Sequence, residues 1–139
     1  MSVAATAATD VVLVVDAANV VGSRPDGWWR DRAGAAARLL DRLAGVVATT
    51  APGPDGGDVR LARVEVVLEG RARDAAAPAV PGLVVHRAPH DGDTEVVRVA
   101  EEVDAPVLVV TADQGLRMRL GDVRAVGPGW LLALLDPAR

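Results

Sequence analysis

Short runs of β-branched and other aliphatic residues recur along the chain and predict buried strands. Residues 11–15 are continuously apolar and too few for a helix, which is typical of a strand buried on both faces of a sheet. Four later runs, of which the last is the weakest, predict further strands at residues 63–68, 83–86, 107–110 and 123–126.

Between the predicted strands, apolar residues recur at helical spacing. The first such segment is expected to begin near Asp26, and its apolar face consists of Trp29, Ala33, Ala36, Leu40 and Leu43. Similar spacing predicts a helix over residues 93–103 and a short one through Leu116 and Leu120, and Pro128 suits the first turn of a last helix. The Pro- and Gly-rich stretch 51–57 is interpreted as a flexible connection, and residues 71–81 as a loop.

Strands that alternate with helices predict an α/β fold whose mainly parallel sheet is covered by helices on both faces. The common strand order for such a sheet is 3-2-1-4-5. The pieces on either side of residues 51–57 are too small to fold alone, so we expect a single domain over residues 1–139, with residues 1–9 flexible.

The amino-acid composition excludes several classes of protein and several kinds of binding site. Half of the 139 residues are hydrophobic, although Phe, Tyr and Ile are absent, so Val, Leu and Ala must fill the core. The absence of Cys excludes disulfides and thiolate metal sites. No signal peptide or membrane-length apolar run is found, which favours a cytoplasmic protein with no membrane association. A net charge of -4 argues against a protein that simply coats nucleic acid with positive charge.

Acidic residues follow three of the predicted strands. Asp16 follows the first strand, Glu69 the second and Asp113 the fourth. In the order 3-2-1-4-5 these strands are neighbours, so the three acids are expected to converge at the carboxyl edge of the sheet, where ligands bind in open α/β folds. Asp91 and Asp93, at the start of the helix that leads into the fourth strand, fall at the same edge.

Several carboxylates within about 5 Å of one another cannot all stay ionised without a cation. Oxygen donors without Cys suit Mg²⁺ or Mn²⁺, and such an ion can activate water and orient a phosphodiester. Each acid also has a simpler interpretation: Asp91, Asp93 and Asp113 are suited to cap helices, and Glu69 opens an ordinary Glu-Gly turn. Asp16 is harder to explain in that way, because it directly follows a buried apolar run.

Three segments resemble motifs of one known family. Residues 14–22 (VVDAANVVG) resemble the D-G-A-N-V-V-G opening of NYN domains, in particular the YacP-like group of the PIN-like nuclease superfamily. Residues 107–116 (VLVVTADQGL) resemble the V-V-T-A-D-x-x-L segment of that group, and residues 66–70 (VVLEG) are similar to a V-V-F-D-G strand end of the wider superfamily. The order and spacing of the segments agree with this family over nearly the whole chain.

The resemblance implies a PIN-like three-layer fold and a metal-dependent endoribonuclease that uses Mg²⁺ or Mn²⁺ to hydrolyse single-stranded or structured cellular RNA. It carries a metal-binding role to Asp16 and Asp113, and it suggests that Asn19 positions Asp16 or a metal-bound water. Asp93 matches the first acid of the family's D-D-x-I motif, and Thr94 stands where the second is usual. The predicted catalytic residues are therefore Asp16, Asp93, Asp113 and Asn19, with Glu69 or Asp91 as a further metal ligand.

Residues flanking the acids are candidates for contact with RNA. Arg24 and Arg30 are the candidates for holding phosphates, although an arginine at a helix start or on a polar helix face is commonly only solvated, and that interpretation is slightly favoured for Arg30 and Arg32. Trp28 is the candidate for stacking on a base, whereas Trp29 is expected in the core. His86 and His90 are interpreted as structural, and Thr111 either touches a metal-bound water or serves only the turn.

Two other functions stay open. Thr94 in place of a second acid favours a PIN-like module that has lost activity and binds RNA or a protein partner. A nucleotide-binding or regulatory domain of the flavodoxin or receiver type also places acids at strand ends, but a receiver domain would want a Lys after the last strand, and the chain contains none. A homodimer is neither required nor excluded by the sequence.

Overall fold

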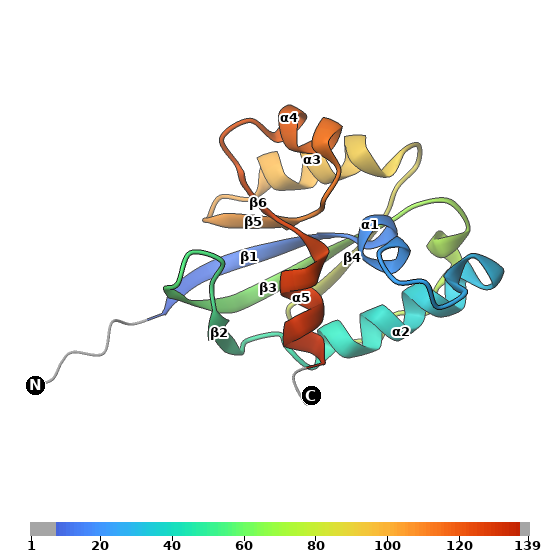
Figure 1. Ribbon diagram of the computed structural model, residues 1–139, viewed down its shortest axis with the longest axis horizontal. Helices are drawn as coiled ribbons and strands as arrows, with labels where there is room; N and C mark the ends of the chain where they lie inside the picture. The colour runs from blue at the N-terminus through green and yellow to red at the C-terminus, as the bar shows by residue number, and fades with distance from the viewer. Residues whose placement is uncertain (1–7, 137–139) are drawn as a thin grey trace, which may run out of the picture.

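The computed structural model describes residues 8–136 and places helices on both faces of one six-stranded sheet (Figure 1). The strands are β1 (Thr9–Asp16), β2 (Thr50–Pro52), β3 (Asp58–Leu68), β4 (Leu83–Arg87), β5 (Val107–Val110) and β6 (Arg124–Val126). The α-helices are α1 (Ala17–Gly22), α2 (Arg32–Ala44), α3 (Gly92–Glu102), α4 (Gln114–Leu120) and α5 (Pro128–Leu135). Two 3-10 helices, η1 (Trp28–Arg30) and η2 (Gly70–Asp74), complete the described elements.

The sheet has the predicted strand order. Strands β4, β3, β1, β5 and β6 lie side by side and are all parallel, which is the order 3-2-1-4-5 of the predicted strands. The short strand β2 is added antiparallel to the first half of β3, on the edge where β4 pairs with the second half. Because β1 is central, the carboxyl ends of β3, β1 and β5 meet at one edge of the sheet.

Alternation along β1 supplies a core on each face of the sheet. Val11, Leu13 and Val15 pack with α1, α2 and α5, whereas Val12 and Val14 pack with α3 and α4. Figure 1 shows α3 and α4 on one side of the sheet and α2 and α5 on the other. This arrangement confirms the three-layer α/β fold. Within residues 8–136, no helix is long and apolar enough to cross a bilayer.

Two predicted boundaries were wrong. The first long helix does not begin near Asp26: Gly27 adopts a left-handed conformation (φ 80°), η1 follows, and α2 begins at Arg32, where Asp31 accepts a hydrogen bond from the backbone N–H of Gly34. Trp29 therefore lies in a separate turn, and it is 53% exposed instead of buried in the core.

The stretch 51–57 is also not a simple flexible connection. Its first residues form β2, and β3 begins at Asp58 instead of residue 63, so the segment is the turn of a hairpin. Trp130 on α5 reaches this hairpin and donates from Nε1 to the carbonyl oxygen of Pro52. Of the stretch 1–9, for which flexibility was expected, residues 1–7 lie outside the described range, and Thr9 is the first residue of β1.

Candidate active site

Asp16 is the buried acid at the centre of the carboxyl edge. It ends β1, caps α1 and is 4% exposed. Thr111 Oγ1 donates to its Oδ2 at 2.9 Å, and the backbone N–H of Asn19 donates to its Oδ1 at 3.4 Å. Burial raises the pKa of Asp16 to about 6, with smaller contributions from the negative charges of Asp93 and Glu69, against the opposing effect of the two hydrogen bonds.

Thr111 and Asn19 tie the loop after β5 to α1. Thr111 is fully buried, and its hydroxyl donates to Asp16 while accepting from the backbone N–H of Asp113 at 3.1 Å. The amide oxygen of Asn19 accepts from the backbone N–H of Ala112 at 2.7 Å. The side chain of Asn19 thus holds the loop that carries Asp113, and its backbone N–H donates to Asp16.

Asp113 and Asp91 both act as helix caps. Asp113 caps α4 by accepting from the N–H of Leu116 at 2.9 Å, and its Oδ2 has no hydrogen bond within residues 8–136. Asp91 caps α3 with both oxygens, which accept from the N–H and the hydroxyl of Thr94. These two bonds lower the pKa of Asp91. Asp113 therefore keeps an oxygen available to a ligand, whereas both Asp91 oxygens serve the helix.

Asp93 lies two residues beyond Asp91, in the first turn of α3, and is partly buried. Its side chain has no hydrogen bond in the described part of the chain. Burial raises its pKa first, and the charges of Asp113 and Asp91 raise it further, while Arg119 opposes them. Asp93 also raises the pKa of Asp16, so Asp93 links the acid of β1 to the acid of the β5 loop.

Glu69 closes the edge from the β3 side. Its Oε2 accepts from the backbone N–H of Gly92 at 3.4 Å, at the start of α3. A Cβ at position 92 would lie 2.5 Å from Glu69 Oε1, so glycine is what allows the carboxylate to approach the helix. The charge of Glu69 also contributes to the raised pKa of Asp16.

The site therefore brings Asp16, Glu69, Asp93 and Asp113 to one edge, with Asp91 beside them but occupied as a cap. Within residues 8–136, no group of three or more Asp, Glu or His side chains is arranged to hold a metal ion. Mg²⁺ nevertheless commonly binds through one or two carboxylates and keeps several waters, so a cage of protein ligands is not required. An all-oxygen donor set in which burial and neighbouring negative charges raise the pKa values of Asp16 and Asp93 fits such an ion.

Sequence reasoning left the role of one side chain at this edge open and did not single out another. It left the role of Thr111 open, and the structure shows it bridging Asp16 and the loop of Asp113. It did not single out Arg119 of α4, which donates to Thr94 Oγ1 at 3.2 Å and whose charge lowers the pKa values of Asp91 and Asp93. The contact between α3 and α4 depends on tertiary packing, so no local spacing in the sequence indicates it.

Trp28, the candidate for stacking on a base, shares a cavity with one of the acids, Glu69. It lines a cavity of about 260 Å³ that also includes Glu69, and it lines a second, more open cavity with Asn19 and Ala112. Arg32 covers the Trp28 ring, with its Cζ 5.3 Å from the ring centroid. A tryptophan face and an arginine at the mouth of an apolar cavity are suited to a flat, uncharged group such as a base.

The other predicted contacts lie further away. Arg30 is exposed over the Trp29 ring, at 5.9 Å, and lines a different cavity with Arg71 and Asp74. Arg24 lines another cavity, between α1 and α2. His86 lies outside the acidic edge: its Nε2 is 2.6 Å from Glu65 Oε1, and its Nδ1 is 3.9 Å from Glu95 Oε2, which agrees with a structural role. His90 is exposed.

Comparison with known proteins connects this arrangement to one solved fold. No protein-family model matches the chain, and no curated protein matches it by sequence. The structure is similar to that of Rae1 (YacP) from Bacillus subtilis, solved as a W164L mutant, with a TM-score of 0.65 and 16% sequence identity. The match covers 91% of this chain and 76% of that one. The fold is thus the PIN-like fold of YacP, the group that the motifs around Asp16 and Asp113 resemble.

Proposed function

We propose that this protein is a metal-dependent ribonuclease that hydrolyses phosphodiester bonds of RNA at the carboxyl edge of its sheet. The observation that carries the proposal is the electrostatic linkage of Asp16, Asp93 and Asp113 on a YacP-like fold. Raised pKa values at neighbouring acids are typical of functional sites, because burying like charges together costs stability unless a ligand uses them.

Each residue has a role that follows from its position. Asp16, Asp93 and Asp113 would hold Mg²⁺ or Mn²⁺, and Glu69 approaches from β3 as a further ligand. When bound, such an ion lowers the pKa of water and neutralises charge on a phosphodiester. Thr111 and Asn19 orient Asp16 and the loop of Asp113, and the cavity lined by Trp28 lies where a base next to the cleaved bond would fit.

Asp91 is the weakest of the predicted ligands. Both of its oxygens accept from Thr94 in capping α3, and its pKa is lowered, whereas the pKa values of Asp16 and Asp93 are raised. Glu95, the other acid nearby, is turned toward Arg98 and His86 and does not replace a second acid at position 94. A single-metal site at Asp16, Asp93 and Asp113 is therefore the arrangement that we propose.

A second candidate function is a PIN-like module that binds RNA or a protein without cleaving RNA. It is favoured by Thr94, which ties up Asp91, and by the lack of a preformed group of three ligands within residues 8–136. The cytoplasmic location and the homodimer stay predictions of the sequence.

Cleavage of RNA separates the two functions. Labelled single-stranded RNA is incubated with Mn²⁺ and with the wild-type protein, Asp16→Asn, Asp113→Asn and the matched control Asp104→Asn, an exposed acid that precedes β5 at the opposite end of that strand. We expect cleavage by the wild type and the control, and a loss of at least about 100-fold in the two site variants, as is usual when an electrostatic group of a catalytic site is removed. Cleavage that persists in both site variants would rule out this mechanism, and binding without cleavage would support the second function.

A further inference from the structure

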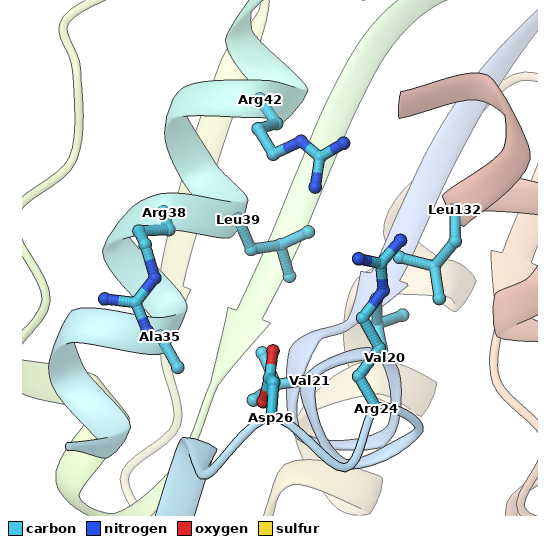
Figure 2. A pocket seen from close by; sticks show the side chains of 9 residues that line it. All are labelled: Val20, Val21, Arg24, Asp26, Ala35, Arg38, Leu39, Arg42 and Leu132. Atoms are coloured by element: carbon cyan, nitrogen blue, oxygen red, sulfur yellow. The ribbon is translucent and has the colours of Figure 1, made fainter. Parts of the chain in front are cut away.

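A cavity separate from the acidic edge lies between α1, α2 and α5 and is lined by three arginines. Arg24 follows α1, while Arg38 and Arg42 lie one turn apart on α2. The cavity has a volume of about 150 Å³ and an aliphatic floor that includes Val20, Leu39 and Leu132. Figure 2 shows the side chains of Arg24 and Arg42 extending from opposite sides toward the opening above Leu39.

These positive charges are poorly compensated. Within residues 8–136, the side chains of Arg24 and Arg38 make no hydrogen bond or ion pair, and the Arg42 guanidinium donates only to the backbone carbonyl oxygen of Leu135. Asp26 is the one acid among the residues that line the cavity, so this lining carries three positive side chains and one negative side chain. In a chain whose net charge is -4, this local excess is opposite in sign to the whole molecule.

Guanidinium groups over an apolar floor suit one class of ligand. Arginine presents planar pairs of N–H donors that match phosphate oxygens, and its positive charge attracts an anion. The aliphatic floor would exclude water from one side of the phosphate and could contact the attached sugar. An apolar ligand would leave the guanidinium groups unpaired, whereas a phosphate would pair them.

The cavity is connected to the acidic edge through α1. Asp16 caps this helix, and Val20 lines the cavity four residues later, about 6 Å further along the helix axis. Leu132 lines both this cavity and the open one that contains Asn19, Ala112 and Trp28. The acidic edge and the arginine cavity are therefore neighbours, joined by α1 and by Leu132 of α5.

We propose that this arginine cavity binds a backbone phosphate of the RNA, next to the segment that lies at the acids. The inference rests on the proposed function for the identity of the ligand. A protein of negative net charge needs a local positive site to hold RNA close to its carboxylates, and the arginine cavity supplies one on the flank of α1.

Binding can be measured apart from cleavage. The affinity for a short fluorescent single-stranded RNA is determined by anisotropy in EDTA at several salt concentrations, for the wild type and for Arg24→Gln/Arg38→Gln. The control is Arg60→Gln/Arg124→Gln, which changes the net charge equally but alters exposed arginines that pair with Asp10 and Asp55 instead of lining the cavity. Arg42 is left unchanged because it supports the end of α5.

We expect the Arg24/Arg38 variant to lose roughly tenfold in affinity at low salt and its log–log salt slope to fall by about 0.7, the value for one phosphate contact on a single strand. Its Tm should stay that of the wild type, because neither side chain has a partner to lose. The Arg60/Arg124 control should keep the slope. Unchanged affinity and slope in the Arg24/Arg38 variant, or no RNA binding by the wild type, would overturn the proposal.

Two further measurements distinguish RNA from free phosphate as the ligand, and the arginine cavity from the proposed ribonuclease activity. If inorganic phosphate raises the Tm of the wild type but not of the Arg24/Arg38 variant while RNA affinity is equal in both, the cavity takes free phosphate and the proposal for RNA is wrong. Cleavage with Mn²⁺ is assayed on the same proteins. Cleavage with no effect of the arginine substitutions on binding contradicts only the arginine cavity, whereas arginine-dependent binding without cleavage contradicts only the ribonuclease.

Discussion

Burial, with a smaller contribution from neighbouring negative charges, raises the pKa of the Asp16 carboxyl group. Its pKa is raised from 3.8 to about 6, although Thr111 and Asn19 both donate to it. Between about pH 4 and pH 6, the Asp16 side chain is therefore protonated in the folded protein and ionised in the unfolded chain. Its contribution to stability is therefore fully present below pH 3.8 and is lost as the pH rises through about 6.

This titration predicts a pH-dependent difference between the wild type and Asp16→Asn. In EDTA, the free energy of unfolding of the wild type should fall relative to the variant between about pH 4 and pH 6, by up to about 3 kcal/mol, and stay level above that range. Urea unfolding at intervals from pH 4 to pH 8 measures this difference, in which titrations common to both proteins cancel. A difference that is constant with pH, or a wild type that gains on the variant, would contradict the assignment of the raised pKa to Asp16.

At the scale of elements, α3 presents two acids with different tasks at its first turn. Asp91 caps the helix and has a lowered pKa, whereas Asp93 faces the other acids and has a raised one. The two residues are alike in sequence reasoning, because either can cap a helix that starts near them. Only the position of the helix start, at Gly92, decides that Asp91 caps the helix and that Asp93 lies in its first turn.

Substitutions at the start of α3 should therefore have opposite consequences. Asp91→Ala is expected to lower the Tm by about 3–5 °C, because a cap is lost, and Asp91→Asn to leave it nearly unchanged, because Asn also caps helices. Asp93→Asn should not lower the Tm in EDTA, because it removes a carboxylate with a raised pKa, but it should abolish RNA cleavage. Thermal unfolding and the cleavage assay check both statements. A destabilised Asp93→Asn with full activity would reverse the two assignments.

The helices and strands also show which parts of the fold could be predicted from the sequence. Apolar runs predicted all five parallel strands, most clearly β1 and β5, which are buried over most of their length, and least clearly the edge strand β6, which begins at the exposed Arg124. The start of α2 and the place of Trp29 were missed because Asp26 and Asp31 are equally good caps, and the left-handed turn at Gly27 decides between them. Strand β2 was missed because it has only three residues and a mostly exposed pattern.

For the whole molecule, strand order is what turns separate acids into a site. Asp16, Glu69 and Asp113 are far apart along the chain, and they converge because β3, β1 and β5 are parallel neighbours. This convergence was predictable from acids at strand ends. The contacts of Thr111 and Arg119, and the cavity shared by Arg24, Arg38 and Arg42, were not, because they depend on how helices and loops pack across the sheet.

The central claim is that the acids at this edge act together as one divalent-cation site, and the shift in Tm caused by Mn²⁺ tests it most directly. Because an ion that binds only the folded state stabilises it, millimolar Mn²⁺ should raise the Tm of the wild type by several degrees. Asp104→Asn should show the same rise, and Asp16→Asn and Asp93→Asn should show little or none. The absence of a rise in the wild type, or an equal rise in all four proteins, would contradict the account.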